Sequence, residues 1–174
     1  MKIKARICMS MDGYVTTPAG WPAQLADPTF VPGESHGIQE FLDGCEAALM
    51  GRVTFEPALE SERWPWPNLK VFVLASHRPE GTPDGVVTDN DPVRLLETLR
   101  EAGTDGDVHL IGGPRTIETY RALGELDTLE LVVMPILLGG GMKLTPALSL
   151  SADLTFERER ELPGGSVELV YACN

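Results

Sequence analysis

The stretch HLIGGPRTIETY, from His109 to Tyr120, decides how this sequence is interpreted. An apolar strand end runs into two adjacent glycines and a proline, and a segment with helical periodicity follows. Glycine costs conformational entropy to order, so a glycine pair that ends a buried strand needs a reason. One reason is a tight turn. The other is a group that approaches the backbone so closely that it leaves no space for a side chain.

Working outward from this stretch, short apolar segments alternate with helical ones. The sequence predicts strands at 3–11, 47–50, 70–75, 84–88, 107–113 and 128–141, and a terminal hairpin over 153–173. Helices are expected at about 35–44, 91–103 and 114–126, and Gly51 is expected to begin a turn. Residues 16–37, rich in Pro and Gly, predict a long irregular loop, a type of segment that is often functional.

The second helix has the clearest signals. Asp91 fits the N-cap, Pro92 fits the first turn, and Gly103 fits the stop. The residues expected to pack inward are Val93, Leu95, Leu96 and Leu99.

Helices between successive strands imply parallel crossovers that cover both faces of a sheet. We therefore expect a three-layer α/β fold with a mostly parallel central sheet and a C-terminal antiparallel hairpin. With 174 residues the chain is expected to form a single domain, 1–174.

Composition excludes several classes of function. The net charge of -12, from 26 acidic and 14 basic residues, disfavours nucleic acid and anionic membranes as partners. No apolar run is long enough to span a bilayer, and a signal peptide is not recognisable, so a cytoplasmic location is expected. Cys8, Cys45 and Cys173 lie in apolar stretches without a CxxC pair, so we expect core cysteines and no metal site.

Glycines follow two of the predicted strands, at Gly51 and at Gly112-Gly113. Ligands of open α/β sheets bind beyond the carboxyl ends of the strands, and helix N-termini bind anions. Each element alone is also compatible with a plain turn beside a surface charge. Together they favour a dinucleotide, with side-chain donors available from Arg52, Thr54, Ser76, Arg78, Arg115 and Thr116.

The motifs MSMDGYV, MGRVTFE, VLASHRP, HLIGGPRTI and PILLGGGMKL occur in this order across nearly the whole chain. The set resembles the dihydrofolate reductase-like superfamily, and within it the reductase domain of riboflavin biosynthesis, the C-terminal part of a bifunctional deaminase-reductase. The resemblance implies a dihydrofolate reductase-like fold, NADPH as cofactor and a homodimer.

By position, the resemblance also implies roles for particular residues. Gly51, Arg52 and Thr54 would hold the phosphates, and Ser76 and Arg78 would lie near the ribose 2′-phosphate. Gly112 and Gly113 would pass beneath the nicotinamide, often with an unusual peptide bond. The residues that would open a helix toward the pyrophosphate are Pro114, Arg115, Thr116 and Ile117.

On the substrate side, Asp12 is the best-placed candidate for a proton donor, or else an Asp-Gly turn residue whose side chain caps its own loop. Trp21, Glu34 and His36 are the candidate substrate residues. Trp64 and Trp66 are expected to line an aromatic cleft, to cover the sheet or to form a subunit contact. The loop 16–37 contains no basic residue, which argues against a phosphorylated substrate.

The sequence therefore predicts an NADPH-dependent reductase that transfers a hydride to a small heterocyclic or carbonyl substrate. Two alternatives stay open: a dihydrofolate or pterin reductase, and a non-catalytic dinucleotide-binding protein.

Overall fold

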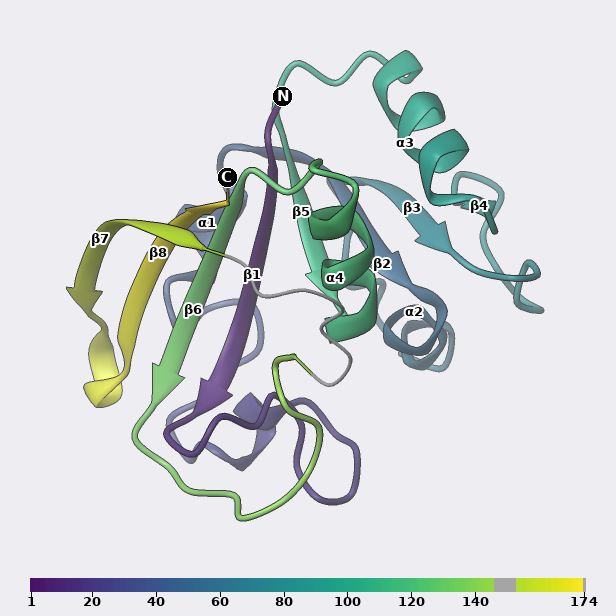
Figure 1. Cartoon of the computed structure of the whole chain (residues 1–174). Coiled ribbons are helices and arrows are strands. Elements are labelled where there is room, and N and C mark those ends of the chain that lie inside the picture. The colour runs from purple at the N-terminus through teal and green to yellow at the C-terminus, as the bar shows by residue number, and fades with distance from the viewer. Residues whose placement is uncertain (146–152, 174) are drawn as a thin grey trace.

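The computed structural model describes residues 1–145 and 153–173, and its centre is one mixed sheet in the order β4-β3-β2-β5-β1-β6-β8-β7 (Figure 1). The strands are β1 (Ile3–Ser10), β2 (Cys45–Gly51), β3 (Lys70–Leu74), β4 (Val87–Asp89), β5 (Asp107–Gly112), β6 (Thr128–Met134), β7 (Leu154–Glu161) and β8 (Val167–Cys173). The helices are α1 (Ile38–Leu42), α2 (Arg52–Leu59), α3 (Pro92–Glu101) and α4 (Pro114–Ala122), with short 3₁₀ turns η1 (Ala23–Ala26) and η2 (Pro163–Gly165).

The pairing of the strands confirms the predicted topology. Strands β1 to β6 pair only in parallel with one another, whereas β8 is antiparallel to both β6 and β7. The hairpin β7-β8 thus extends the parallel sheet at one edge, and its turn is η2, which contains the predicted Pro163-Gly164-Gly165.

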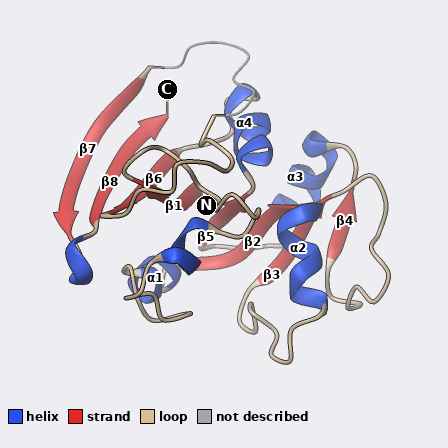
Figure 2. Cartoon of the chain, turned by 90° about the horizontal axis from the view of Figure 1, so that it is seen from below, coloured by secondary structure: helices blue, strands red, loops and turns tan. Residues whose placement is uncertain are grey.

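Helices cover both faces of this sheet, so the predicted three layers are also confirmed (Figure 2). Alternate residues of β2 show the division, because successive strand residues point to opposite faces. Leu49 packs in a cluster with Leu95 of α3 and Tyr120 of α4, whereas Met50 packs with Phe55 of α2. Helix α1 lies on the same face as α2, where its Phe41 contacts the ring of His109 on β5.

Helix α3 begins as its sequence predicts. The carboxylate of Asp91 accepts hydrogen bonds from the backbone N–H groups of Val93 and Arg94, and Pro92 occupies the first turn. The leucines of its apolar face are buried. The expectation for Val93 is wrong, since it is 49% exposed: at 3.6 residues per turn, Val93 lies to one side of the stripe formed by Leu95, Leu96 and Leu99.

Two other predictions about helices need correction. Helix α2 replaces the turn expected after Gly51. The helix is short and contains Pro57, so its sequence has no recognisable helical pattern of apolar residues. Helix α1 is shorter than expected, because Gly37 at its N-cap has a left-handed φ of 68° and residues before it cannot continue the helix.

A network of buried ion pairs joins β1 to the terminal hairpin. The Nη1 of Arg6 lies 2.9 Å from Glu130 Oε2 and 2.5 Å from Glu168 Oε1, and all three side chains are almost fully buried. Arg160 of β7 also binds Glu168, at 2.7 Å. Burial alone would raise the pKa of Glu168, but hydrogen bonds from Arg6 and Arg160 outweigh burial and hold that pKa below its ordinary value.

The three cysteines are free, with Cys45 buried and the other two half-buried. Within the described residues, no helix is long and apolar enough to cross a membrane.

Replacing Arg6 with Ala would leave Glu130 and Glu168 buried and without their shared partner. We expect Arg6→Ala to lower the free energy of unfolding by about 3–5 kcal/mol. Urea denaturation followed by circular dichroism measures this change. Arg63→Ala, at an exposed loop position, serves as the control and should change stability by less than about 0.5 kcal/mol. Equal stability of the two variants would contradict the role given to Arg6.

Candidate functional site

The candidate site lies where two helices begin side by side at the carboxyl ends of neighbouring strands. Strand β2 runs directly into α2 through Gly51, and β5 runs into α4 through Gly113. The two helices then diverge to opposite faces of the sheet, which makes this edge a topological switch point (Figure 2). Both helices have glycine at the N-cap, so neither cap residue offers a side chain to its helix start, and this edge combines two helix starts that suit an anion.

Contact between the two helix starts explains why position 51 is glycine. A Cβ at Gly51 would lie 2.4 Å from Thr116 Oγ1 of α4, which is far inside van der Waals contact. The φ of Gly51 is -84°, so its backbone conformation makes no demand for glycine. The requirement is therefore spatial: α2 and α4 could not start this close together with a side chain at position 51.

The glycine pair of the opening motif has a different geometry. Gly112 has a φ of 123°, a conformation that L side chains rarely adopt, and the peptide bond between Gly112 and Gly113 is cis. Among the described residues, a Cβ at Gly113 would meet only Thr54 Oγ1, at an ordinary 3.7 Å. The positive φ of Gly112 thus explains why this residue is glycine. At Gly113, by contrast, the neighbouring residues leave space for a small side chain.

The predicted cofactor residues fall into two groups. Gly51, Arg52, Thr54 and the run Gly112–Ile117 come together at the two helix starts, where Arg115 is exposed. Arg52 forms an ion pair with Glu56 one turn along α2, with Nη1 at 2.7 and 2.8 Å from the two carboxylate oxygens. Sequence reasoning missed this partner, although the i, i+4 spacing of the two residues signals it.

The second group lies in the loop after β3. Ser76 is exposed, and its hydroxyl lies 3.2 Å from His77 Nδ1. Arg78 is engaged within its own loop, since its guanidinium donates to the backbone carbonyls of Val86 and Pro83 at 2.7 Å each. These hydrogen bonds of Arg78 stabilise the loop that carries Ser76.

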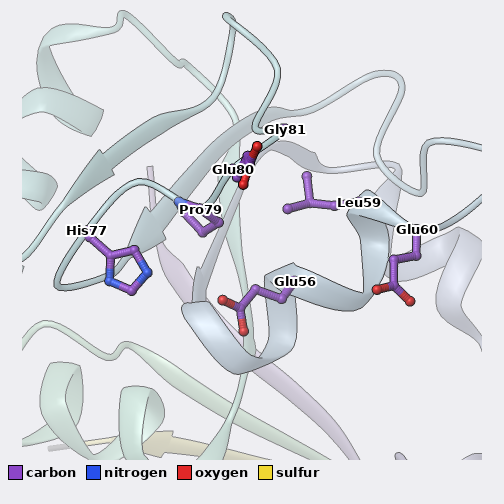
Figure 3. A pocket seen from close by; sticks show the side chains of 7 residues that line it. All are labelled: Glu56, Leu59, Glu60, His77, Pro79, Glu80 and Gly81. Carbon is purple, nitrogen blue, oxygen red and sulfur yellow. The ribbon is translucent and has the colours of Figure 1, made fainter.

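Between this loop and α2 lies a cavity of about 490 Å³ (Figure 3). The Glu56 side chain points from α2 toward the loop that carries His77. The residues that line the cavity are Glu56, Leu59, Glu60, His77, Pro79, Glu80 and Gly81. Its three glutamates make the cavity a poor site for an anion.

Asp12 lies at the end of β1 and binds the loop that follows β6. One carboxylate oxygen accepts from the Ser10 hydroxyl at 2.6 Å, and the other accepts from the backbone N–H of Gly139 at 2.7 Å. The Ser10 hydroxyl, together with the N–H groups of Leu138 and Gly139, lowers the pKa of Asp12 to about 2. Asp12 is therefore ionised at neutral pH, and its carboxylate caps the loop that follows β6 rather than its own loop.

The candidate substrate residues differ in exposure. Trp21 is 59% exposed and Glu34 is exposed, whereas His36 is buried. The Nε2 of His36 lies 2.9 Å from Asp27 Oδ2, and its Nδ1 lies 2.8 Å from the Ser35 hydroxyl. The His36–Asp27 pair holds the long loop closed upon itself, and sequence reasoning assigned no role to Asp27.

Packing within the chain decides between the cleft and the sheet cover for the two tryptophans. Trp64 and Trp66 lie against each other and against Phe55 of α2, with Phe55 and Trp66 stacked at 6.3 Å between centroids. They cover the sheet rather than line a substrate cleft.

With this geometry established, comparison with known proteins identifies the family. The model of the RibD C-terminal domain matches residues 1–167. The chain belongs to this family. Among curated relatives of this RibD C-terminal domain, the uncharacterised protein YyaP of Bacillus subtilis is 24% identical over 182 residues, which cover 97% of this chain and 93% of YyaP. YwjB of the same organism, also uncharacterised, is 20% identical and matches 95% of this chain and 94% of its own length.

Solved structures share the fold of this RibD C-terminal domain. A protein of Shewanella sp. PV-4 named for riboflavin biosynthesis has a TM-score of 0.82 at 24% identity and covers 100% of this chain and 99% of its own. The bifunctional deaminase/reductase of Thermotoga maritima has a TM-score of 0.72 at 14% identity, with 99% of this chain and 56% of that chain covered. Dihydrofolate reductase of Enterococcus faecalis, solved with NADP(H), has a TM-score of 0.68 at 18% identity and covers 99% of this chain and 96% of its own. These likenesses confirm the dihydrofolate reductase-like fold.

The contact between Gly51 and Thr116 predicts a specific coupling. Gly51→Ala should destabilise the protein by about 1–3 kcal/mol, because the new methyl group overlaps the Thr116 hydroxyl. In Gly51→Ala/Thr116→Ala this hydroxyl is gone and the nearest remaining side-chain atom would be 3.7 Å away, so most of the loss should be recovered. Urea unfolding of the single and double variants measures the coupling, and strictly additive losses would contradict the contact.

Proposed function

We propose that this protein is an NADPH-dependent reductase that transfers a hydride to a small heterocyclic or carbonyl substrate. The observation that carries the proposal is the pair of helix starts at Gly51 and Gly113, which face each other at a switch point of the sheet. Membership in the RibD C-terminal domain family supports a reductase, and the fold shared with a dihydrofolate reductase solved with NADP(H) supports the cofactor.

In this proposal each group of residues binds one part of the cofactor. The backbone N–H groups at the starts of α2 and α4, with Thr54, Arg115 and Thr116, hold the pyrophosphate. Arg52 and Ser76 hold the ribose 2′-phosphate, and Arg78 stabilises the loop on which Ser76 lies. Gly113 leaves an open backbone surface for the nicotinamide, next to the end of β1.

When bound, the cofactor supplies the hydride, and the protein orients it. A carboxylate with a pKa of about 2 cannot deliver a proton at neutral pH, so Asp12 acts by holding the 138–139 loop against β1. The proton that completes the reduction then comes from solvent. We further propose a single domain located in the cytoplasm that forms a homodimer, the oligomeric state that the resemblance implies.

The test of the proposal is a substitution at Gly113. In Gly113→Ala the new methyl group fits against Thr54, so the protein should fold, but the methyl group would occupy the surface proposed for the nicotinamide. We expect the Kd for NADPH, measured by its fluorescence, to rise at least about tenfold. Gly44→Ala is the matched control, because a Cβ at Gly44 meets open space at the amino end of β2.

Unchanged NADPH affinity in a folded Gly113→Ala variant would contradict the proposed site. Binding of NADPH without its oxidation, in the presence of dihydrofolate and carbonyl compounds alike, would favour the non-catalytic alternative. Oxidation that depends on dihydrofolate would favour the pterin reductase.

The ion pair between Arg52 and Glu56 provides a test of the 2′-phosphate site. Glu56 competes with the phosphate for Arg52, so Glu56→Gln should tighten NADPH binding about twofold to fivefold and leave NADH binding unchanged. Parallel fluorescence titrations with the two cofactors measure this difference. Weaker binding of NADPH to Glu56→Gln would contradict this role of Arg52.

A further inference from the structure

The proposed function fixes where an electron acceptor must approach, and the following inference rests on that function. If the nicotinamide lies at the end of β5, the rest of the cofactor extends over the start of α2, on the β2 side of β5. The neighbour of β5 on its other side is β1, followed by β6. The acceptor therefore meets the loops that follow these two strands, residues 11–37 and 135–143. Backbone hydrogen bonds join these loops, from Met11 N to Ile136 O and from Val15 N to Met142 O.

The cations of the protein can be accounted for completely, because all 14 Lys and Arg residues lie in the described part of the chain. On the face beneath the two loops, each guanidinium already has a carboxylate partner. Arg6 binds Glu130 and Glu168, and Arg158 binds Glu168 at 3.1 Å. Arg160 binds both Glu168 and Glu40.

The loops themselves contain one cation, Lys143, against the carboxylates of Asp12, Asp27 and Glu34. Lys143 is held by the Asp12 backbone carbonyl at 2.6 Å, and its Nζ lies 3.9 Å from the centre of the Tyr14 ring. A phosphate on this side would therefore meet an excess of negative charge. Lys143 alone would have to offset both the phosphate and these carboxylates, which makes binding of a phosphate here unfavourable.

The same loops expose large apolar side chains instead. Leu137 is 77% exposed, Met11 63%, Trp21 59%, Leu25 55% and Met142 38%. Exposed apolar groups concentrated on two joined loops are typical of a surface that binds a partner or ligand. A planar apolar molecule suits this surface, and a phosphorylated sugar does not.

We propose that the electron acceptor is an uncharged, planar, conjugated carbonyl compound, of which a quinone is the simplest example, and that it carries no phosphate. A hydride passes from C4 of the nicotinamide to the acceptor, and a proton from water protonates the acceptor oxygen. NADPH becomes NADP⁺, the carbonyl compound gains two electrons and two hydrogens, and hydroxide is released to the buffer.

Three compounds test this choice as acceptors in NADPH oxidation followed at 340 nm: 1,4-naphthoquinone, 5-amino-6-(5-phosphoribosylamino)uracil and the same uracil without its phosphate. The phosphorylated uracil is the substrate in the name of the Thermotoga maritima protein. We expect kcat/KM to be highest for the quinone, and at least about tenfold higher for the unphosphorylated uracil than for its phosphate, if either uracil reacts. A preference for the phosphorylated uracil, or no oxidation with any compound by protein that binds NADPH, would overturn the proposal. Failure to bind NADPH at all would instead remove the proposed function.

A variant on the apolar loops separates binding of the acceptor from binding of the cofactor. Leu137→Asp adds a charge at a highly exposed position, so the protein should fold normally. We expect the KM for the quinone to rise about tenfold with kcat and the Kd for NADPH little changed. Leu123→Asp is the matched control, because Leu123 is an exposed apolar residue at the other end of α4. Equal KM values for the two variants would overturn the assignment of this surface.

Discussion

The near contact between Gly51 and Thr116 is the constraint on which the rest of the site depends. It allows α2 and α4 to begin side by side and then to pack on opposite faces of the sheet. Two sets of helix N–H groups consequently open toward the same edge. The side chains of Arg52 and Arg115 are brought to this edge by the same geometry, since each lies in the first turn of its helix. A side chain at position 51 would separate the helices and divide the anion site.

Beyond this edge, charge divides the molecule into two sides. At the side proposed for the cofactor, Arg115 is exposed and the carboxylate paired with Arg52 is itself partly exposed, so both guanidinium groups are accessible from solvent. On the other side, Arg6 and Arg160 form ion pairs with the buried Glu168, and these pairs join β1, β7 and β8. The cations that stabilise the terminal hairpin are therefore not available to a substrate, and the surface above them is apolar.

Local signals in the sequence predicted the elements that depend on local interactions. The N-cap Asp91 and the turn in the terminal hairpin are determined by residues next to one another, and both are as expected. Helix α2 was missed because packing on the sheet, rather than its own periodicity, stabilises it. The environments of Arg78 and His36 were also beyond prediction, since each is paired across a loop whose path no short motif specifies.

The central claim, that a dinucleotide binds between the starts of α2 and α4, is tested most directly by amide hydrogen exchange with and without NADPH. The account predicts slower exchange in peptides that cover residues 52–54 and 115–117, with α3 unaffected. Protection confined to other segments, or no protection at either helix start at saturating NADPH, would contradict it.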